Sequence, residues 1–358
     1  MKKHLTVILA VFVSVTFFSC RGGGERPVEP ADGITVVFVP KVTGNSFFEV
    51  ANQGAQEYGA RHGFKVDYRG SPVAEVAEQR KIVEDAIKNK IRALSISSLD
   101  STALNEVLKR AKNAGMKITT WDSDVAGDSR YIMISQGTPA QLGRMLVEMG
   151  AKSLEKRGKH PVTNPIKYAW HYSQAMVADQ NSWRDAGEEY IKTNYPNWEN
   201  VHPDNYYSFQ DPEKALEVGR QILAENPDID LIILNDSTSL PAQAKVLKEL
   251  GKTSEDLTIT GFSPPNAMRE YAKEGIIDRW GLWDCKVQGA LATYISYYLA
   301  SGNQLNVGQM IDIPDVGLVE IMPNTVLDPD AYTAPDSGVI LLPKRTEFTL
   351  ENVDDYDF

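Results

Sequence analysis

The chain has 358 residues, a formal net charge of -11 and the apolar content of a soluble globular protein. This length exceeds what one small hydrophobic core organises, and it fits two lobes of ordinary size. The acidity argues against nucleic acid as a partner, because a protein that binds phosphates presents a basic face.

Residues 1–20 form a leader separate from the globular part. A basic start, MKKH, precedes an apolar run from Leu5 to Phe18 that is short for a bilayer span and typical of a secretion signal. Cys20 follows a small residue, as in a bacterial lipobox, so we predict a lipoprotein signal peptide with Cys20 as the lipidation site. A plain signal peptide cleaved elsewhere is the alternative, since Phe17 stands where Leu is usual. The Gly- and Pro-rich residues 21–33 are predicted to be a tether.

From Ile34 onward, β-branched runs alternate with amphipathic segments. Strands are predicted over 34–40, 64–70, 91–97 and 116–122, separated by helices over 46–63, 73–90 and 101–115. The rhythm restarts with strands over 131–137, 167–173, 230–236, 257–263 and 278–284, alternating with helices over 138–156, 179–195, 240–251, 266–275 and 286–300. This alternation predicts an α/β fold of two doubly wound parallel-sheet lobes.

Polar side chains follow these strands where ligands of such sheets bind, beyond the carboxyl ends. They are Lys41, Ser97, Ser98 and Asp122 in the first half, and Asp179, Gln180, Asn235, Asp236, Ser263 and Asp284 in the second. We expect Asp122 to face a cleft between the lobes beside the others. Asp124 is predicted to be a loop or capping residue, because Asp is common there.

Aromatic residues near the same strand ends are further candidates for ligand contact. They are Phe47, Phe48, Trp121, Trp183 and Trp283. Apolar faces of sugars pack on aromatic rings, although ordinary core packing is the alternative for each ring.

Catalytic and metal-binding motifs are missing from the sequence. The five His residues have no ligand spacing, and there is no G-x-S-x-G elbow, so no catalytic residue, metal or cofactor is predicted. An acid–base pair of Asp122 and Asp179 cannot be distinguished here from two hydroxyl acceptors, which leaves a sugar hydrolase as a distant alternative. Cys285 is predicted to be a small core residue.

Several stretches resemble the type I periplasmic solute-binding proteins of sugar-type ABC importers, and more narrowly the Lsr-type receptors for autoinducer-2. The most telling are FVPKVTGNSFF, TWDSD, SQGTPAQLG, DQNSW, GFSPPNAMR, GLWD, IDIP and the C-terminal GVILLPKRTEF. The resemblance runs from about Ile34 to Phe358. It implies the periplasmic binding protein type I fold, with two lobes joined by a three-segment hinge.

The resemblance also implies a ligand site. Family motifs place ligand contacts at Lys41, at Asp122, and at the pair Asp179 and Gln180. Where the family has Pro and Ala, this chain has Asn235 and Ser237, which implies a smaller and more polar wall. Carboxylates accept hydrogen bonds from hydroxyls, whereas Lys and Gln donate them, so these residues suit a neutral polyol.

The implied organisation assigns residues 34–133 and 285–312 to an N-terminal lobe, and 134–284 and 313–358 to a C-terminal lobe. Crossings between them are expected near 130–136, 283–286 and 311–316. We expect a monomeric, non-enzymatic lipoprotein, anchored outside the cytoplasm in the periplasm or on the cell surface, that delivers ligand to an ABC permease. Autoinducer-2 is the first ligand, with a role in quorum sensing, and a pentose or a deoxyhexose such as rhamnose is the alternative. A sensor that docks on a chemoreceptor also stays open.

Overall fold

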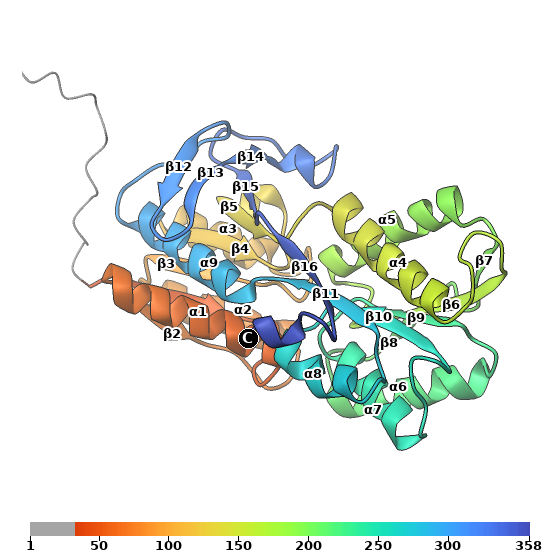
Figure 1. Cartoon of the computed structure of the whole chain (residues 1–358). Helices are drawn as coiled ribbons and strands as arrows, with labels where there is room; N and C mark the ends of the chain where they lie inside the picture. The colour runs from red at the N-terminus through yellow and green to blue at the C-terminus, as the bar shows by residue number, and fades with distance from the viewer. Residues whose placement is uncertain (1–32) are drawn as a thin grey trace, which may run out of the picture.

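The computed structural model describes residues 33–358, which form two lobes side by side (Figure 1). Cys20, the predicted signal peptide and residues 21–32 of the predicted tether lie outside the described residues. Within the described part, no helix combines the length and the apolar character that a membrane span requires.

The first lobe is built on a seven-stranded sheet with the order β14-β15-β5-β4-β3-β1-β2. Its strands are β1 (Thr35–Val39), β2 (Lys65–Tyr68), β3 (Ala93–Ile96), β4 (Lys117–Trp121), β5 (Ile132–Ser135), β14 (Met322–Pro323) and β15 (Gly338–Leu341). Neighbouring strands are parallel, except that β14 runs antiparallel to β15. The helices of this lobe are α1 (Ser46–His62), α2 (Val76–Lys88), α3 (Asn105–Asn113) and α9 (Cys285–Ala300).

The inner strand β1 is apolar from Val36 to Val39 because helices cover both faces of the sheet there. Val36 and Phe38 of β1 belong to the core that includes α1 and α9, whereas Val37 and Val39 belong to the core under α2 and α3. Consecutive side chains of a strand point to opposite faces, so the run TVVFV fills two cores at once. Cys285 is buried with a free thiol at the start of α9, which confirms its prediction as a core residue.

The second lobe contains a parallel sheet with the order β10-β9-β6-β7, and β8 pairs with the end of β6. Its strands are β6 (Ile166–Tyr172), β7 (Trp198–Asn200), β8 (Tyr206–Tyr207), β9 (Leu231–Leu234) and β10 (Thr258–Gly261). Its helices are α4 (Pro139–Lys156), α5 (Ala178–Asn194), α6 (Pro212–Glu225), α7 (Ser239–Glu249) and α8 (Pro265–Lys273). The pair α4 and α5 and the pair α6 and α7 cover the two faces of this sheet (Figure 1).

Three of these elements, α6, β7 and β8, were not predicted. The two strands have three residues and two residues, too few for an alternating pattern to emerge. The sequence does contain signals for the start of α6, because Asp211 is its N-cap and Pro212 is its first residue.

The C-terminal region corrects the predicted lobe boundaries. Residues 311–316 form the turn region of a hairpin, β12 (Met310–Ile313) with β13 (Gly317–Glu320), and do not cross between lobes. Strand β15 then pairs with β5 in the first sheet, and β16 (Arg345–Thr349) pairs antiparallel with β11 (Arg279–Trp283). The third crossing is therefore at 342–344, and residues 313–341 belong to the first lobe. Only the short 3-10 helix Asn324–Val326 interrupts these late strands. No α-helix separates them, so the strand–helix alternation that predicted the other elements is missing.

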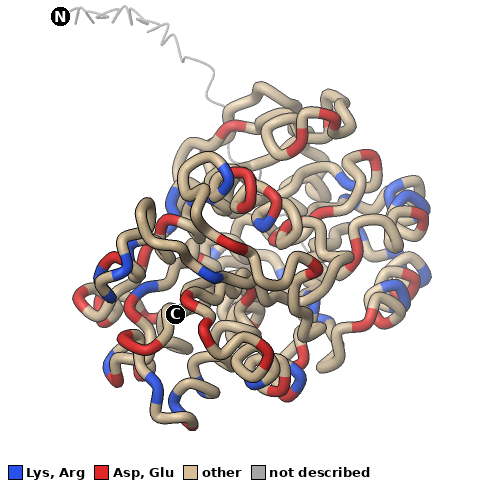
Figure 2. Tube along the Cα trace, turned by 90° about the vertical axis from the view of Figure 1, so that its right-hand side faces the viewer, with Lys and Arg blue, Asp and Glu red and all other residues tan. Residues whose placement is uncertain are grey.

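The other two crossings lie close to their predicted places, between β5 and α4 and between β11 and α9. Charged residues of both signs are interspersed along the outer helices of both lobes (Figure 2). Lys41 and Asp122 are buried instead, between the lobes at the ends of β1 and β4. Charged side chains are rarely buried without a partner, so this position calls for an explanation.

Candidate functional site

Lys41 is the centre of the site. It follows β1 by two residues and is 2 % exposed. Its Nζ lies 2.9 Å from Oδ2 of Asp122 in the same lobe and 3.4 Å from Oδ2 of Asp179 in the other lobe. One ammonium group thus bridges carboxylates on both sides of the cleft.

Asp122 is held in an uncommon backbone conformation. Its φ is +60°, in the left-handed region that few residues other than Gly occupy. Ser97 donates a hydrogen bond of 2.7 Å to its Oδ2, and Gln136 Nε2 donates one of 3.0 Å to its main-chain oxygen. Such strain persists only where the surroundings impose it, and it is common at binding sites. The strand end therefore turns sharply at Asp122 and directs the carboxylate toward Lys41.

Asp179 and Gln180 open α5 on the opposite lobe. Ser123, from the first lobe, donates a hydrogen bond to Oδ1 of Asp179. Gln180 Oε1 accepts a 3.2 Å bond from the backbone N–H of Ser173, which leaves its amide N–H₂ group for the cavity. Asn235 Nδ2 donates a hydrogen bond of 2.9 Å to the main-chain oxygen of Gln180. This bond links the start of α5 to the end of β9.

Burial and charge act against each other at Lys41 and Asp179. Burial alone lowers the pKa of Lys41, but the carboxylates of Asp122 and Asp179 together outweigh it, so its pKa is raised. Burial raises the pKa of Asp179 to about 6, although Lys41 acts in the opposite direction. The lysine therefore stays charged, whereas Asp179 can take up a proton in mildly acidic solution.

Aromatic rings form an apolar wall beside this polar cluster. Trp283 has edge-to-face contacts with Phe47 of the first lobe and with Trp183 and Phe262 of the second, with ring centroids 5.4 to 5.8 Å apart. Phe48 packs edge-on against Phe47 at 5.1 Å. Four predicted aromatic candidates thus meet at one place. Trp121 stacks on Phe47 from the core side, with ring centroids 6.2 Å apart, and does not line the cavity.

These groups enclose a narrow cavity between the lobes, with a volume of about 30 Å³. It is lined by Lys41, Phe47, Phe48, Asp122, Gln180, Trp183, Gln210, Asn235, Asp236, Ser237, Phe262, Leu282 and Trp283. Asp179 lies at its border, where a second groove of about 560 Å³ begins that also includes Asp122 and Trp183. The structure thus brings the six predicted ligand-contact residues and four secondary candidates together.

Asp284 and Asp124 have structural roles. Asp284 is exposed and accepts a 3.0 Å bond from the N–H of Val287, which caps α9. This corrects its place among the ligand-contact candidates, since a strand-end Asp also suits a helix N-cap. Asp124 forms a two-pronged ion pair with the buried Arg130, at 2.5 and 3.0 Å, rather than serving as a mere loop residue.

Four lining residues were not predicted as contacts. Gln210 follows β8, a strand that sequence patterns did not reveal, and its φ of +57° has no sequence signature. Phe262 and Leu282 were hidden inside predicted strands. Asp236 is buried and caps α7 through bonds to the N–H groups of Thr238 and Ser239 at 2.7 and 2.9 Å. Only Asp236 lay among the polar strand ends that the sequence made visible.

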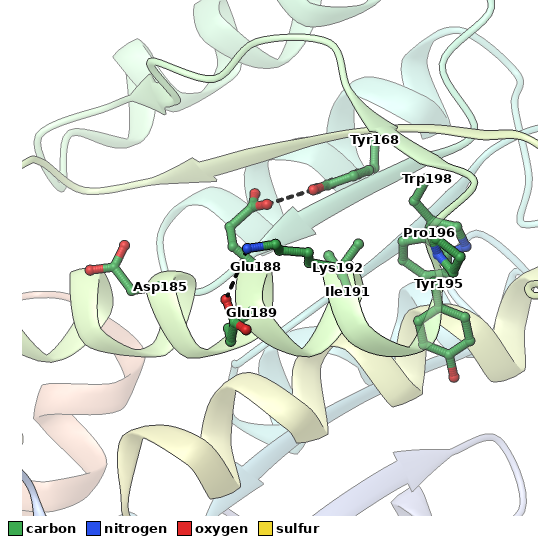
Figure 3. Close-up of a pocket in the computed structure, with 9 residues that line it drawn as sticks. All are labelled: Tyr168, Asp185, Glu188, Glu189, Ile191, Lys192, Tyr195, Pro196 and Trp198. Carbon is green, nitrogen blue, oxygen red and sulfur yellow. Dashed lines mark hydrogen bonds and ion pairs between the residues drawn. The ribbon is translucent and has the colours of Figure 1, made fainter.

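A further surface pocket of about 470 Å³ lies at the C-terminal end of α5, away from the cleft (Figure 3). Glu188 there accepts a 2.7 Å bond from the hydroxyl of Tyr168, and Tyr195 stacks on Trp198. These polar groups are paired with each other. Among the described residues no cluster of His, Cys, Asp and Glu has the arrangement of a metal site.

Chemically, the interlobe cavity offers ionised acceptors, amide groups and one ammonium group against an aromatic wall. Carboxylates and amides exchange hydrogen bonds with hydroxyl groups, and rings cover apolar C–H faces. An anionic ligand would meet Asp122, Asp179 and Asp236 against the single charge of Lys41. The arrangement therefore favours a small neutral molecule that carries several hydroxyl groups.

Comparisons with known proteins agree with this geometry. The sequence profile of the periplasmic binding protein domain matches residues 36–304. The solved structure of LsrB from Clostridium saccharobutylicum in complex with AI-2 is 55 % identical, with a TM-score of 0.90, and the match covers 91 % of this chain and all of that one.

More distant relatives share the fold. An ABC transporter solute-binding protein from Clostridium phytofermentas with bound L-rhamnose is 22 % identical, with a TM-score of 0.79, over 90 % of this chain and 97 % of that one. The D-ribose/D-allose-binding protein of Pseudomonas aeruginosa is 24 % identical over 260 residues, which are 70 % of this chain and 76 % of that protein.

Proposed function

Because the chain belongs to the periplasmic binding protein family, we propose that it is the extracytoplasmic receptor of an ABC importer for autoinducer-2. The ligand enters the open cleft, contacts both lobes and shifts the protein toward the closed form. A membrane permease then recognises that form and accepts the ligand.

One observation carries the proposal, namely the bridge that Lys41 makes between Asp122 and Asp179 across the closed cleft. These charges come from different lobes and meet only when the lobes close. The aromatic wall beside them is also built from both lobes. The chemistry of a small polyol matches this combination, because its hydroxyls pair with the charged groups while its apolar face lies on the rings.

Autoinducer-2 is favoured over other polyols by the 55 % identical relative whose structure contains AI-2. The second candidate is a simple sugar, a pentose or a deoxyhexose such as rhamnose. Asn235 and Ser237 support it, since they make one wall of the cavity more polar than the Pro and Ala of the family pattern.

The proposal includes three features that depend on the sequence alone. Cys20 carries a lipid that holds the receptor at the membrane surface. The receptor acts as a monomer, and its cargo makes it part of quorum sensing. No catalytic role is proposed, because ligand capture accounts for the polar groups of the cavity.

Mass spectrometry of the small molecules released from purified, denatured protein tests this function. We expect autoinducer-2 in chemically unchanged form, in a ratio near one per chain when cells produce it. A released pentose or deoxyhexose would replace autoinducer-2 by the second candidate. Hydrolysis products of a larger glycoside would contradict the receptor and indicate an enzyme.

A further inference from the structure

Asn45 has a role that the ligand site does not explain. It stands just before α1, half-buried, and is not among the residues that line the cavity. Its Oδ1 accepts a 2.9 Å bond from the N–H of Phe47, so it caps the helix that presents Phe47 and Phe48 to the cavity.

The same side chain also crosses the cleft. Its Oδ1 accepts a 3.0 Å bond from the hydroxyl of Ser237, and its Nδ2 donates a 3.0 Å bond to Oγ1 of Thr238. Both partners lie at the start of α7 in the second lobe. The backbone N–H of Thr238 there donates a hydrogen bond of 2.7 Å to Oδ1 of Asp236. One amide group therefore joins the capped end of α1 to the capped end of α7.

We propose that Asn45, Ser237 and Thr238 form an interlobe clasp that sets ligand affinity through the closure of the lobes; Asn45 and Thr238 lie outside the cavity lining. Asn45 is a positioning residue, because it acts through the closure of the lobes. The clasp bonds form only when the lobes meet, so they stabilise the closed form over the open form. Stabilising the closed form strengthens the apparent affinity for every ligand by the same factor.

Ser237 takes part in the contact between the lobes as well as in the wall of the cavity. As a wall residue, its hydroxyl would discriminate among ligands. In the structure its hydroxyl is already donated to Asn45, so it cannot donate a second bond to a ligand. The bond that Ser237 donates then raises the affinity for all ligands alike, and its hydroxyl can contact a ligand only as an acceptor.

The test uses variants that remove the clasp and keep the helix cap. Ser237→Ala and Thr238→Val delete the two partners in the second lobe and leave Asn45 in place on α1. Each lost bond weakens affinity about fivefold, and the double variant does so up to about 25-fold. Ser182→Ala is the matched control, since the Ser182 hydroxyl bonds at 2.7 Å within its own lobe, to the main-chain oxygen of Asp179.

Calorimetry with autoinducer-2, L-rhamnose and D-ribose separates a clasp from a ligand contact. The inference predicts the same fold-loss for every ligand that binds, together with faster dissociation. A loss that differs tenfold between ligands, or no loss at all, overturns the clasp.

The clasp rests on the proposed receptor function, so a second readout needs no ligand. Single-molecule fluorescence transfer between dyes on the two lobes reports the closed fraction of the ligand-free protein. The double variant should lower that fraction by the same factor, whereas equal closed fractions in wild type and variant overturn the inference. If none of the ligands binds, the proposed function fails, and this second readout still decides on the clasp.

Discussion

Asp122 and Asp124 stand two residues apart, and the structure gives them opposite tasks that substitution can separate. In Asp122→Asn the side chain keeps its size, and Asn tolerates the φ of +60° at this position. What disappears is the ionised acceptor that faces Lys41 at 2.9 Å and the cavity. A hydrogen bond to a charged group contributes about 1.5–3 kcal/mol. The affinity for the ligand should therefore fall by roughly 10- to 150-fold.

The thermal stability of ligand-free Asp122→Asn should change little. Lys41 and Asp122 both belong to the first lobe, and their pair faces water once the cleft opens, so it contributes little to folding. The matched control is Asp124→Asn. Its carboxylate pairs with Arg130, which is 2 % exposed and would be left as a buried charge without its partner. Such a loss costs about 3 kcal/mol of the free energy of unfolding, while ligand affinity stays unchanged.

Calorimetric titration and thermal unfolding of both variants decide the case. We expect affinity to fall only in Asp122→Asn and stability to fall only in Asp124→Asn. Unchanged affinity in Asp122→Asn, or an equal loss of affinity in both variants, refutes the assignment of Asp122 as a ligand contact.

Three further predictions follow from the site and the leader. Burial raises the pKa of Asp179 to about 6 in the closed cleft, above the usual carboxyl value of about 4, so closure takes up protons between those values. Affinity should then rise as the pH falls from 7 to 5, with proton uptake visible by calorimetry in buffers of different ionisation enthalpy. Proton release, or the same uptake in Asp179→Asn, contradicts this. Asn235→Ala removes the 2.9 Å hydrogen bond to the main-chain oxygen of Gln180. Calorimetric titration should show ligand affinity about tenfold weaker. An unchanged affinity would show that this bond does not position α5. Cys20→Ser should leave the protein unprocessed or release it from the membrane. The intact mass of the wild-type mature chain checks the anchor, because a chain that starts elsewhere and carries no lipid rules it out.

The parts of the site that sequence reasoning found share one physical property. Lys41, Asp122 and the pair Asp179 and Gln180 directly follow strands or open helices, and the carboxyl ends of parallel strands converge at the cleft. Their meeting place follows from that topology. Asp284 stands at the same kind of position, yet its carboxylate caps α9. Position alone does not separate a cap from a ligand contact.

The parts that were missed depend on tertiary contacts. Gln210 reaches the cavity from a loop after a two-residue strand. Strand β15 joins the first sheet without an α-helix between it and the preceding strand. Ser237 was predicted beside the cavity, where the structure places it, but its bond joins it to Asn45, 192 positions away in the chain. Contacts between residues so far apart in the sequence leave no local pattern in the chain.

The central claim is that this receptor closes over autoinducer-2, and titration of ligand-stripped wild-type protein tests it most directly. Calorimetry with autoinducer-2, L-rhamnose and D-ribose should show saturable binding of one autoinducer-2 per chain, tighter than that of either sugar. Tight binding of one of the sugars with no heat from autoinducer-2 would contradict the claim.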